Sequence, residues 1–65
     1  MKNTHGKTAK ERIIEDIEYV ERIKEKADRI LLATKALGAA DFAVEFNLIT
    51  YNEWETYIDR IFKLL

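Results

Sequence analysis

Five carboxylates gather in one stretch, where their types and spacing could bind a metal ion: Glu15, Asp16, Glu18, Glu21 and Glu25. Di-iron sites in helical bundles add a His one turn after a Glu, and both side chains point into the core. The chain has a single His, His5, which precedes every expected helix. The acids also lie mostly opposite the apolar stripe of their segment. A solvated helix surface is therefore the favoured interpretation, and we expect no metal.

Residue types that act as nucleophiles are scarce in this chain. It has neither Ser nor Cys, and its Thr residues have no nearby base that would activate a hydroxyl. No glycine-rich phosphate-binding loop is present. We therefore expect no enzymatic activity and no cofactor.

Basic side chains that could contact phosphate are concentrated near the N-terminus: Lys2, Lys7, Lys10 and Arg12. The net charge of the whole chain is −1, which gives no overall attraction to nucleic acid. The expected last helix begins with Asn52, Glu53 and Glu55, where a DNA-reading helix needs hydrogen-bond donors. A small DNA-binding accessory protein is therefore kept only as a second alternative.

Acidic side chains dominate the C-terminal half, because the stretch from Asp41 to Asp59 has five acids and no Lys or Arg. The plainer interpretation is a solvated surface. The sharper one is an acidic surface that binds a basic groove of a larger protein, with Tyr51 as an aromatic contact beside the turn. The residues of this candidate surface are Asp41, Glu45, Tyr51, Glu53 and Glu55.

The elements that position these side chains are expected to be helices. Two Thr-x-x-Glu patterns, Thr8 with Glu11 and Thr50 with Glu53, have the spacing of capping boxes and predict helices that begin at residues 9 and 51. Asn47 tolerates a left-handed backbone and is expected to close the preceding helix. Residues 1–7 are expected to form a flexible basic tail, and residues 8–65 a single all-α domain.

The stretch from residue 9 to 47 allows two interpretations at Gly38. An apolar stripe keeps its phase through this Gly, which favours one long helix, kinked or thinned there, that folds against the short C-terminal helix as a hairpin. The alternative is a three-helix mini-bundle with a break at Gly38. The residues of the stripe on either side of Gly38 are Leu31, Phe42, Phe46 and Ile49.

A length argument follows from the hairpin. At about 1.5 Å per residue, a helix over 51–64 spans about 21 Å, against about 58 Å for the long one. The apolar side chains near the start of the long helix would then need a second chain to cover them. We expect a homo-oligomer, most simply a dimer, or a complex with a larger protein. The predicted interface residues are Ile13, Ile17, Val20, Ile23 and Leu31.

The run Leu48–Glu55, together with the terminal Lys63-Leu64-Leu65, resembles the helical hairpin of short C-terminal (SHOCT-type) domains. It departs from that pattern at Asn47, where Gly is favoured, and at Lys63, which directly abuts the leucines. More loosely, the chain is similar to small helical accessory proteins of phages and mobile elements. Both resemblances imply binding to another protein, and neither names a target.

These observations favour a non-enzymatic α-helical protein–protein interaction module that self-associates through its N-terminal helix. The alternative is a phage or mobile-element inhibitor that occupies a basic groove of a host nuclease through the acidic surface. No uncharged run approaches the roughly 20 residues that cross a bilayer, and the N-terminus lacks the apolar segment of a signal peptide. We therefore expect a cytoplasmic protein that does not bind membranes.

Overall fold

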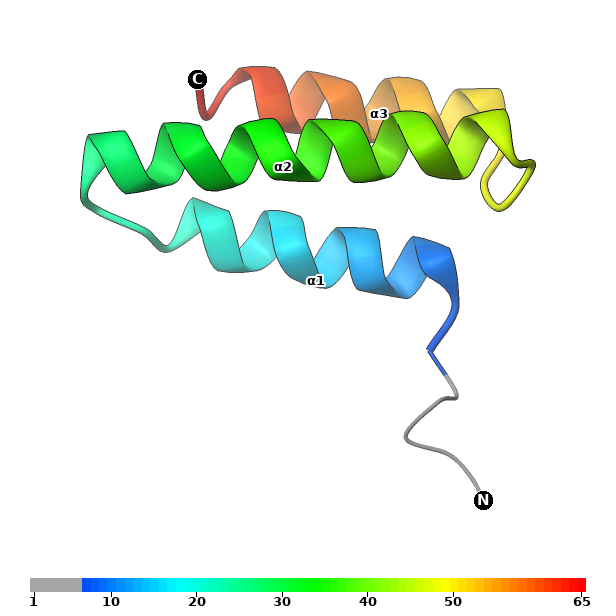
Figure 1. Cartoon of the computed structure of the whole chain (residues 1–65), viewed down its shortest axis with the longest axis horizontal. Helices are drawn as coiled ribbons and strands as arrows, with labels where there is room; N and C mark the ends of the chain where they lie inside the picture. The colour runs from blue at the N-terminus through cyan, green and yellow to red at the C-terminus, as the bar shows by residue number, and fades with distance from the viewer. Residues whose placement is uncertain (1–6) are drawn as a thin grey trace.

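The computed structural model describes residues 7–65 and consists of three helices (Figure 1). These are α1 (Ala9–Glu21), α2 (Lys26–Glu45) and α3 (Tyr51–Phe62). Helix α2 lies between the other two and packs against both of them. The all-α class is confirmed, in the form of a three-helix mini-bundle. The expected flexible tail falls almost entirely on residues 1–6, which lie outside the described residues.

Both predicted capping boxes are present. The Glu11 amide donates to Thr8 Oγ1 at 3.2 Å, and the Thr8 amide donates to the Glu11 carboxylate at 2.9 Å. At α3 the Glu53 amide donates to Thr50 Oγ1 at 3.1 Å, and the Thr50 amide donates to Glu53 at 2.8 Å. The two short motifs therefore fix where α1 and α3 begin, because each satisfies two N-terminal amides that the helix itself leaves unpaired.

The end of α2 is set by Asn47, which has a φ of 61°. The Leu48 amide donates to the Ala43 carbonyl at 2.8 Å, and the Asn47 amide donates to the Val44 carbonyl at 3.2 Å. This pair of bonds is a Schellman motif, which needs one left-handed residue just after the helix. The expectation that Asn47 closes the preceding helix is confirmed.

The favoured single helix over 9–47 and the alternative of a break at Gly38 are both wrong. The chain bends at residues 22–25, and Gly38 lies inside α2. This bend contains no Gly or Pro, and no side chain caps the start of α2. Arg29 stabilises the bend, since its Nη1 donates to the Ile23 carbonyl at 3.3 Å while its Nε donates to the Leu64 carbonyl at 3.4 Å. Tertiary packing decides this break, because folding α1 back buries its apolar side.

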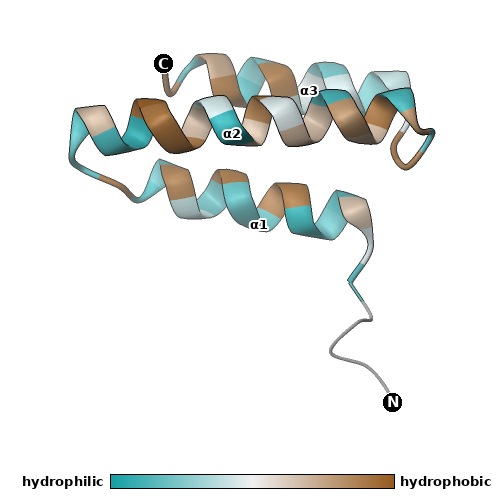
Figure 2. Cartoon of the chain, viewed as in Figure 1, coloured by the Kyte–Doolittle hydropathy of each residue, from teal (hydrophilic) through white to brown (hydrophobic). Residues whose placement is uncertain are grey.

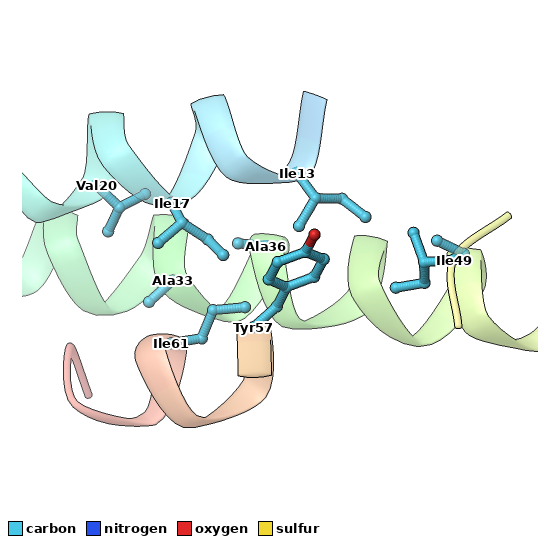
Figure 3. Close-up of a cluster of buried hydrophobic side chains, with 9 residues drawn as sticks. Ile13, Ile17, Val20, Ala33, Ala36, Ile49, Tyr57 and Ile61 are labelled. Carbon is cyan, nitrogen blue, oxygen red and sulfur yellow. The ribbon is translucent and has the colours of Figure 1, made fainter. Parts of the chain in front are cut away.

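The core lies where α1 and α3 meet over an alanine-lined side of α2. In Figure 3, Ile17 of α1 and Ile61 of α3 point toward one another beside Ala33 of α2. Both isoleucines and Ala33 are fully buried. The small side chains let α1 and α3 approach α2 closely, so that larger residues fill the centre. The remaining buried members of this cluster are Ile13, Val20, Ala36, Ala43, Ile49 and Tyr57.

The predicted interface on the N-terminal helix therefore needs correction. Ile13, Ile17 and Val20 retain only 3%, 0% and 3% of their exposure within the single chain. The length argument assumed one long helix, whereas the bend gives these residues two neighbouring helices to pack on. Ile23 is half-buried, and Leu31 alone of the five is largely exposed, at 59%.

Candidate functional site

One side of α2 remains apolar and uncovered. Leu31, Phe42 and Phe46 are 59%, 57% and 59% exposed, and they recur at the spacing that places residues on one helix face. The Phe42 and Phe46 rings are 4.5 Å apart between centroids and tilted by 33°. Figure 2 shows hydrophobic segments in brown at intervals along α2, with hydrophilic segments in teal between them. We call this surface the α2 outer face, and it comprises Leu31, Lys35, Gly38, Ala39, Phe42 and Phe46.

The α2 outer face borders a groove between α1 and α2. Two hollows of about 300 Å³ each lie along this groove, and Asp16 of α1 lines both. Lys35 and Tyr19 line the first, while Phe42 and Leu48 line the second. Tyr19 and Leu48 are themselves 57% and 54% exposed. The apolar surface of α2 therefore continues sideways across the groove onto α1 and onto the loop after α2.

Sequence reasoning recognised only Leu31 of this surface as an interface residue. It missed Phe42 and Phe46 as binding candidates, although their common face with Leu31 was visible in the pattern. The missing signal was the position of the alanines. Ala33, Ala36, Ala40 and Ala43 are the buried residues of α2, so the core side of this helix is its small-residue side and the large apolar residues point outward.

The predicted acidic surface is partly engaged by the chain itself. Asp41 Oδ1 accepts a hydrogen bond from Trp54 Nε1 at 2.7 Å, which links α2 to α3. Glu53 caps α3 and pairs with Lys10 Nζ of α1 at 3.0 Å. The Tyr51 ring packs on Trp54 with centroids 5.3 Å apart. Three of the five predicted residues therefore have structural contacts, while Glu45 and Glu55 are exposed. Binding to a basic groove stays a prediction.

Ion pairs join α1 to α3 and use residues that the sequence offered for other chemistry. Arg60 holds Glu21 through two hydrogen bonds, with Nε to Oε2 at 3.2 Å and Nη2 to Oε1 at 2.9 Å. A further pair, Lys7 with Glu15, lies within the N-terminal segment and does not involve α3. Within residues 7–65, no three potential metal ligands of the His, Cys, Asp or Glu types are grouped together. DNA binding through Lys7, Lys10 and Arg12 stays a prediction, and Lys2 lies outside the described residues.

The capping carboxylates make the stability of the fold depend on pH. The pKa of Glu53 lies below 4.5, chiefly because its carboxylate accepts the Thr50 amide hydrogen bond, with help from Lys10. The pKa of Glu11 is lowered in the same way by the Thr8 amide. A carboxylate whose pKa is lower in the folded state than in the unfolded state stabilises the fold when the pH is above its unfolded-state pKa. This stabilisation is lost as the pH falls through the folded-state pKa. We expect thermal stability to fall as the pH drops below about 4.5.

Circular dichroism melts at pH 7 and across this acid range would measure that loss. Glu53→Gln should lower the melting temperature at pH 7 and flatten the acid decline. Glu55→Gln removes one charge from the same helix and leaves the cap intact, so it is the matched control. Equal acid declines in wild type and Glu53→Gln would show that the capping carboxylate does not contribute.

With this geometry in place, the class of the chain is a small all-α domain of three helices. No protein-family model, curated protein or solved structure matches it. The resemblance to SHOCT-type hairpins and to phage accessory proteins accordingly stays a prediction. Separately, none of the helices formed by the described residues is long and apolar enough to cross a bilayer.

Proposed function

We propose that the chain is a non-enzymatic α-helical protein–protein interaction module and that it binds through the α2 outer face. The observation that carries this proposal is the exposure of Leu31, Phe42 and Phe46 on one helix side. All three lie outside the core cluster. Contiguous exposed apolar patches rimmed by polar residues mark interaction sites in soluble proteins.

The energetics of the fold support this assignment. A helix position that faces solvent is served better by Ala, Lys or Glu than by Phe, whose helix propensity is lower. Phe42 and Phe46 contact one another, yet each still leaves more than half of its surface in water. Burial of these rings by a partner would add the apolar stabilisation that folding leaves unused, since an aromatic side chain offers about 150–250 Å².

A photo-crosslinking amino acid placed at position 42 tests the proposal in the cells that express the chain. Irradiation should produce covalent adducts between the chain and a polypeptide. The control position is Phe62 of α3, which is an aromatic residue of nearly equal exposure, 56% against 57%, outside the α2 outer face. Adducts that form at position 62 as readily as at 42, or at neither position, would overturn the proposal.

A further inference from the structure

We infer that the partner covered by the α2 outer face is a second copy of this chain, packed so that the two α2 helices run antiparallel and cross near Gly38 and Ala39. This inference rests on the proposed function, because it names the occupant of the same surface. Three observations point to this occupant: the symmetric spacing of the face, the open space at its centre, and the order of its charges.

The spacing of the face is the same when it is traversed in either direction. Leu31 and Phe46 lie about 11 Å on either side of the midpoint between Gly38 and Ala39. Each end therefore carries a large apolar residue and the centre carries small ones. When two such helices run antiparallel, Leu31 of one copy meets Phe46 of the other at both ends. A parallel pair would place each large residue against its own equivalent.

The centre of the face is open in the single chain. A Cβ atom built on Gly38 would have no heavy atom within 4 Å outside the helix backbone and its neighbours. The backbone does not require Gly there either, because the chain has no Gly with positive φ among its described residues. Gly weakens a helix interior relative to Ala, so the fold of the single chain gains nothing from it. A second helix that crosses at this point could occupy the space that a side chain would fill, because small residues let helix axes approach closely.

The charges of Lys35 and Glu45 are complementary between two copies only in the antiparallel orientation. Lys35 lies before the midpoint and Glu45 after it, while Asp41 is already held by Trp54 of α3. Lys35 and Glu45 are exposed and have no ion-pair partner among residues 7–65. The antiparallel arrangement brings Lys35 of each copy to the acidic end of the other. A parallel arrangement would bring Lys35 beside Lys35 and Glu45 beside Glu45, which is repulsive.

The size of the face indicates a weak dimer. Its exposed aromatic and aliphatic surface, with the stem of Lys35, amounts to roughly 400 Å² per copy. Two copies would bury about 800 Å² in total, below the 1,200 Å² or more of a standard stable interface. The net charge of −1 adds little repulsion between copies. We expect a dissociation constant of about 10–300 µM for the dimer.

Sedimentation equilibrium from about 5 µM to 1 mM tests the dimer, a range that brackets the expected dissociation constant. The average mass should rise from that of the monomer toward twice that value. Phe42→Lys should weaken association about tenfold or more, because it removes apolar contact and places a cation opposite Lys35. Phe62→Lys alters an equally exposed Phe on α3 and should leave association unchanged. Circular dichroism of both variants checks that the fold is intact.

Charge exchange tests the orientation. Lys35→Glu and Glu45→Lys should each weaken the dimer about fivefold, and the double variant should restore it to within about twofold of wild type. In an antiparallel pair, the double variant still places an acidic side chain of one copy near a basic side chain of the other, so the attraction between the copies is kept. Failure of the double variant to restore association would overturn the antiparallel arrangement.

The outcomes separate this inference from the proposed function. A chain that stays monomeric at 1 mM, yet forms adducts with a different polypeptide at position 42, keeps the proposed function and removes the second copy as its partner. Adducts at position 42 that contain two copies of the chain support both. A monomer that forms no adducts contradicts both.

Discussion

Replacing Ile17 with Ala is expected to lower the free energy of unfolding by about 3 kcal/mol. Ile17 is fully buried, and in Figure 3 it points from α1 into the centre of the cluster. Truncation removes apolar burial and leaves a cavity that α1, α2 and α3 would have to collapse to fill. The whole domain is expected to be stable by only about 3–10 kcal/mol, so this single change removes about a third or more of that stability and would unfold about half of the population at the lower end of the range.

Leu31→Ala is the matched control, since it also shortens a large aliphatic side chain on a helix. Leu31 is 59% exposed, and we expect its truncation to change the stability of the monomer by no more than about 0.5 kcal/mol. Urea denaturation at low protein concentration measures both values. If the side of α1 that carries Ile17 were instead an interface between chains, Ile17→Ala would give a folded monomer of nearly wild-type stability, and that result would refute the three-helix packing.

The parts of the fold that were predictable from the sequence are those encoded by neighbouring residues. The two capping boxes, the left-handed Asn47 and the all-α class each follow from short-range chemistry at fixed spacing. Such motifs act on backbone groups within a few residues, so they need no knowledge of the rest of the chain.

The bend at residues 22–25 was not predictable in this way, because no local residue requires it. Three of its four residues are charged, the fourth is Ile23, and it contains neither Gly nor a capping side chain. Burial of each aliphatic side chain stabilises the fold by about 1.5–3 kcal/mol. The bend forms because burying the isoleucines of α1 on α2 and α3 contributes more than the chain loses by leaving a few helical hydrogen bonds unmade. Gly38 was the stronger local signal for a break. The helix α2 nevertheless continues through it, because the buried alanines before and after Gly38 must lie on one continuous helix face to form the core.

The same reasoning explains why the candidate site was only partly recognised. A stripe of large apolar residues usually marks the core side of a helix. In α1 this stripe was predicted to be an interface between chains, whereas the structure buries it in the core of the single chain. In α2 the assignment is inverted, because four alanines form the buried side and the large residues face solvent. The deciding fact is which side of α2 the other two helices approach, and this depends on the bend.

Enlarging the buried side of α2 should therefore be nearly as damaging as emptying the core. Ala33 is fully buried and lies in Figure 3 between the isoleucines of α1 and α3. Ala33→Leu adds three carbon atoms at a fully buried position of the core, which would force the helices apart or the side chains into strained rotamers. We expect a loss of about 1–3 kcal/mol or more in the free energy of unfolding.

Ala27→Leu makes the same chemical change on the same helix at an exposed position. Because Leu and Ala have similar helix propensities, this control should stay within about 0.5 kcal/mol of wild type. Thermal and urea denaturation of the two variants measure the difference directly. If the alanines of α2 were merely strong helix formers on a loosely packed side, the two substitutions would have equal effects. A large loss at residue 33 alone would mean that small side chains there set how closely α1 and α3 pack, and hence which side of α2 remains exposed.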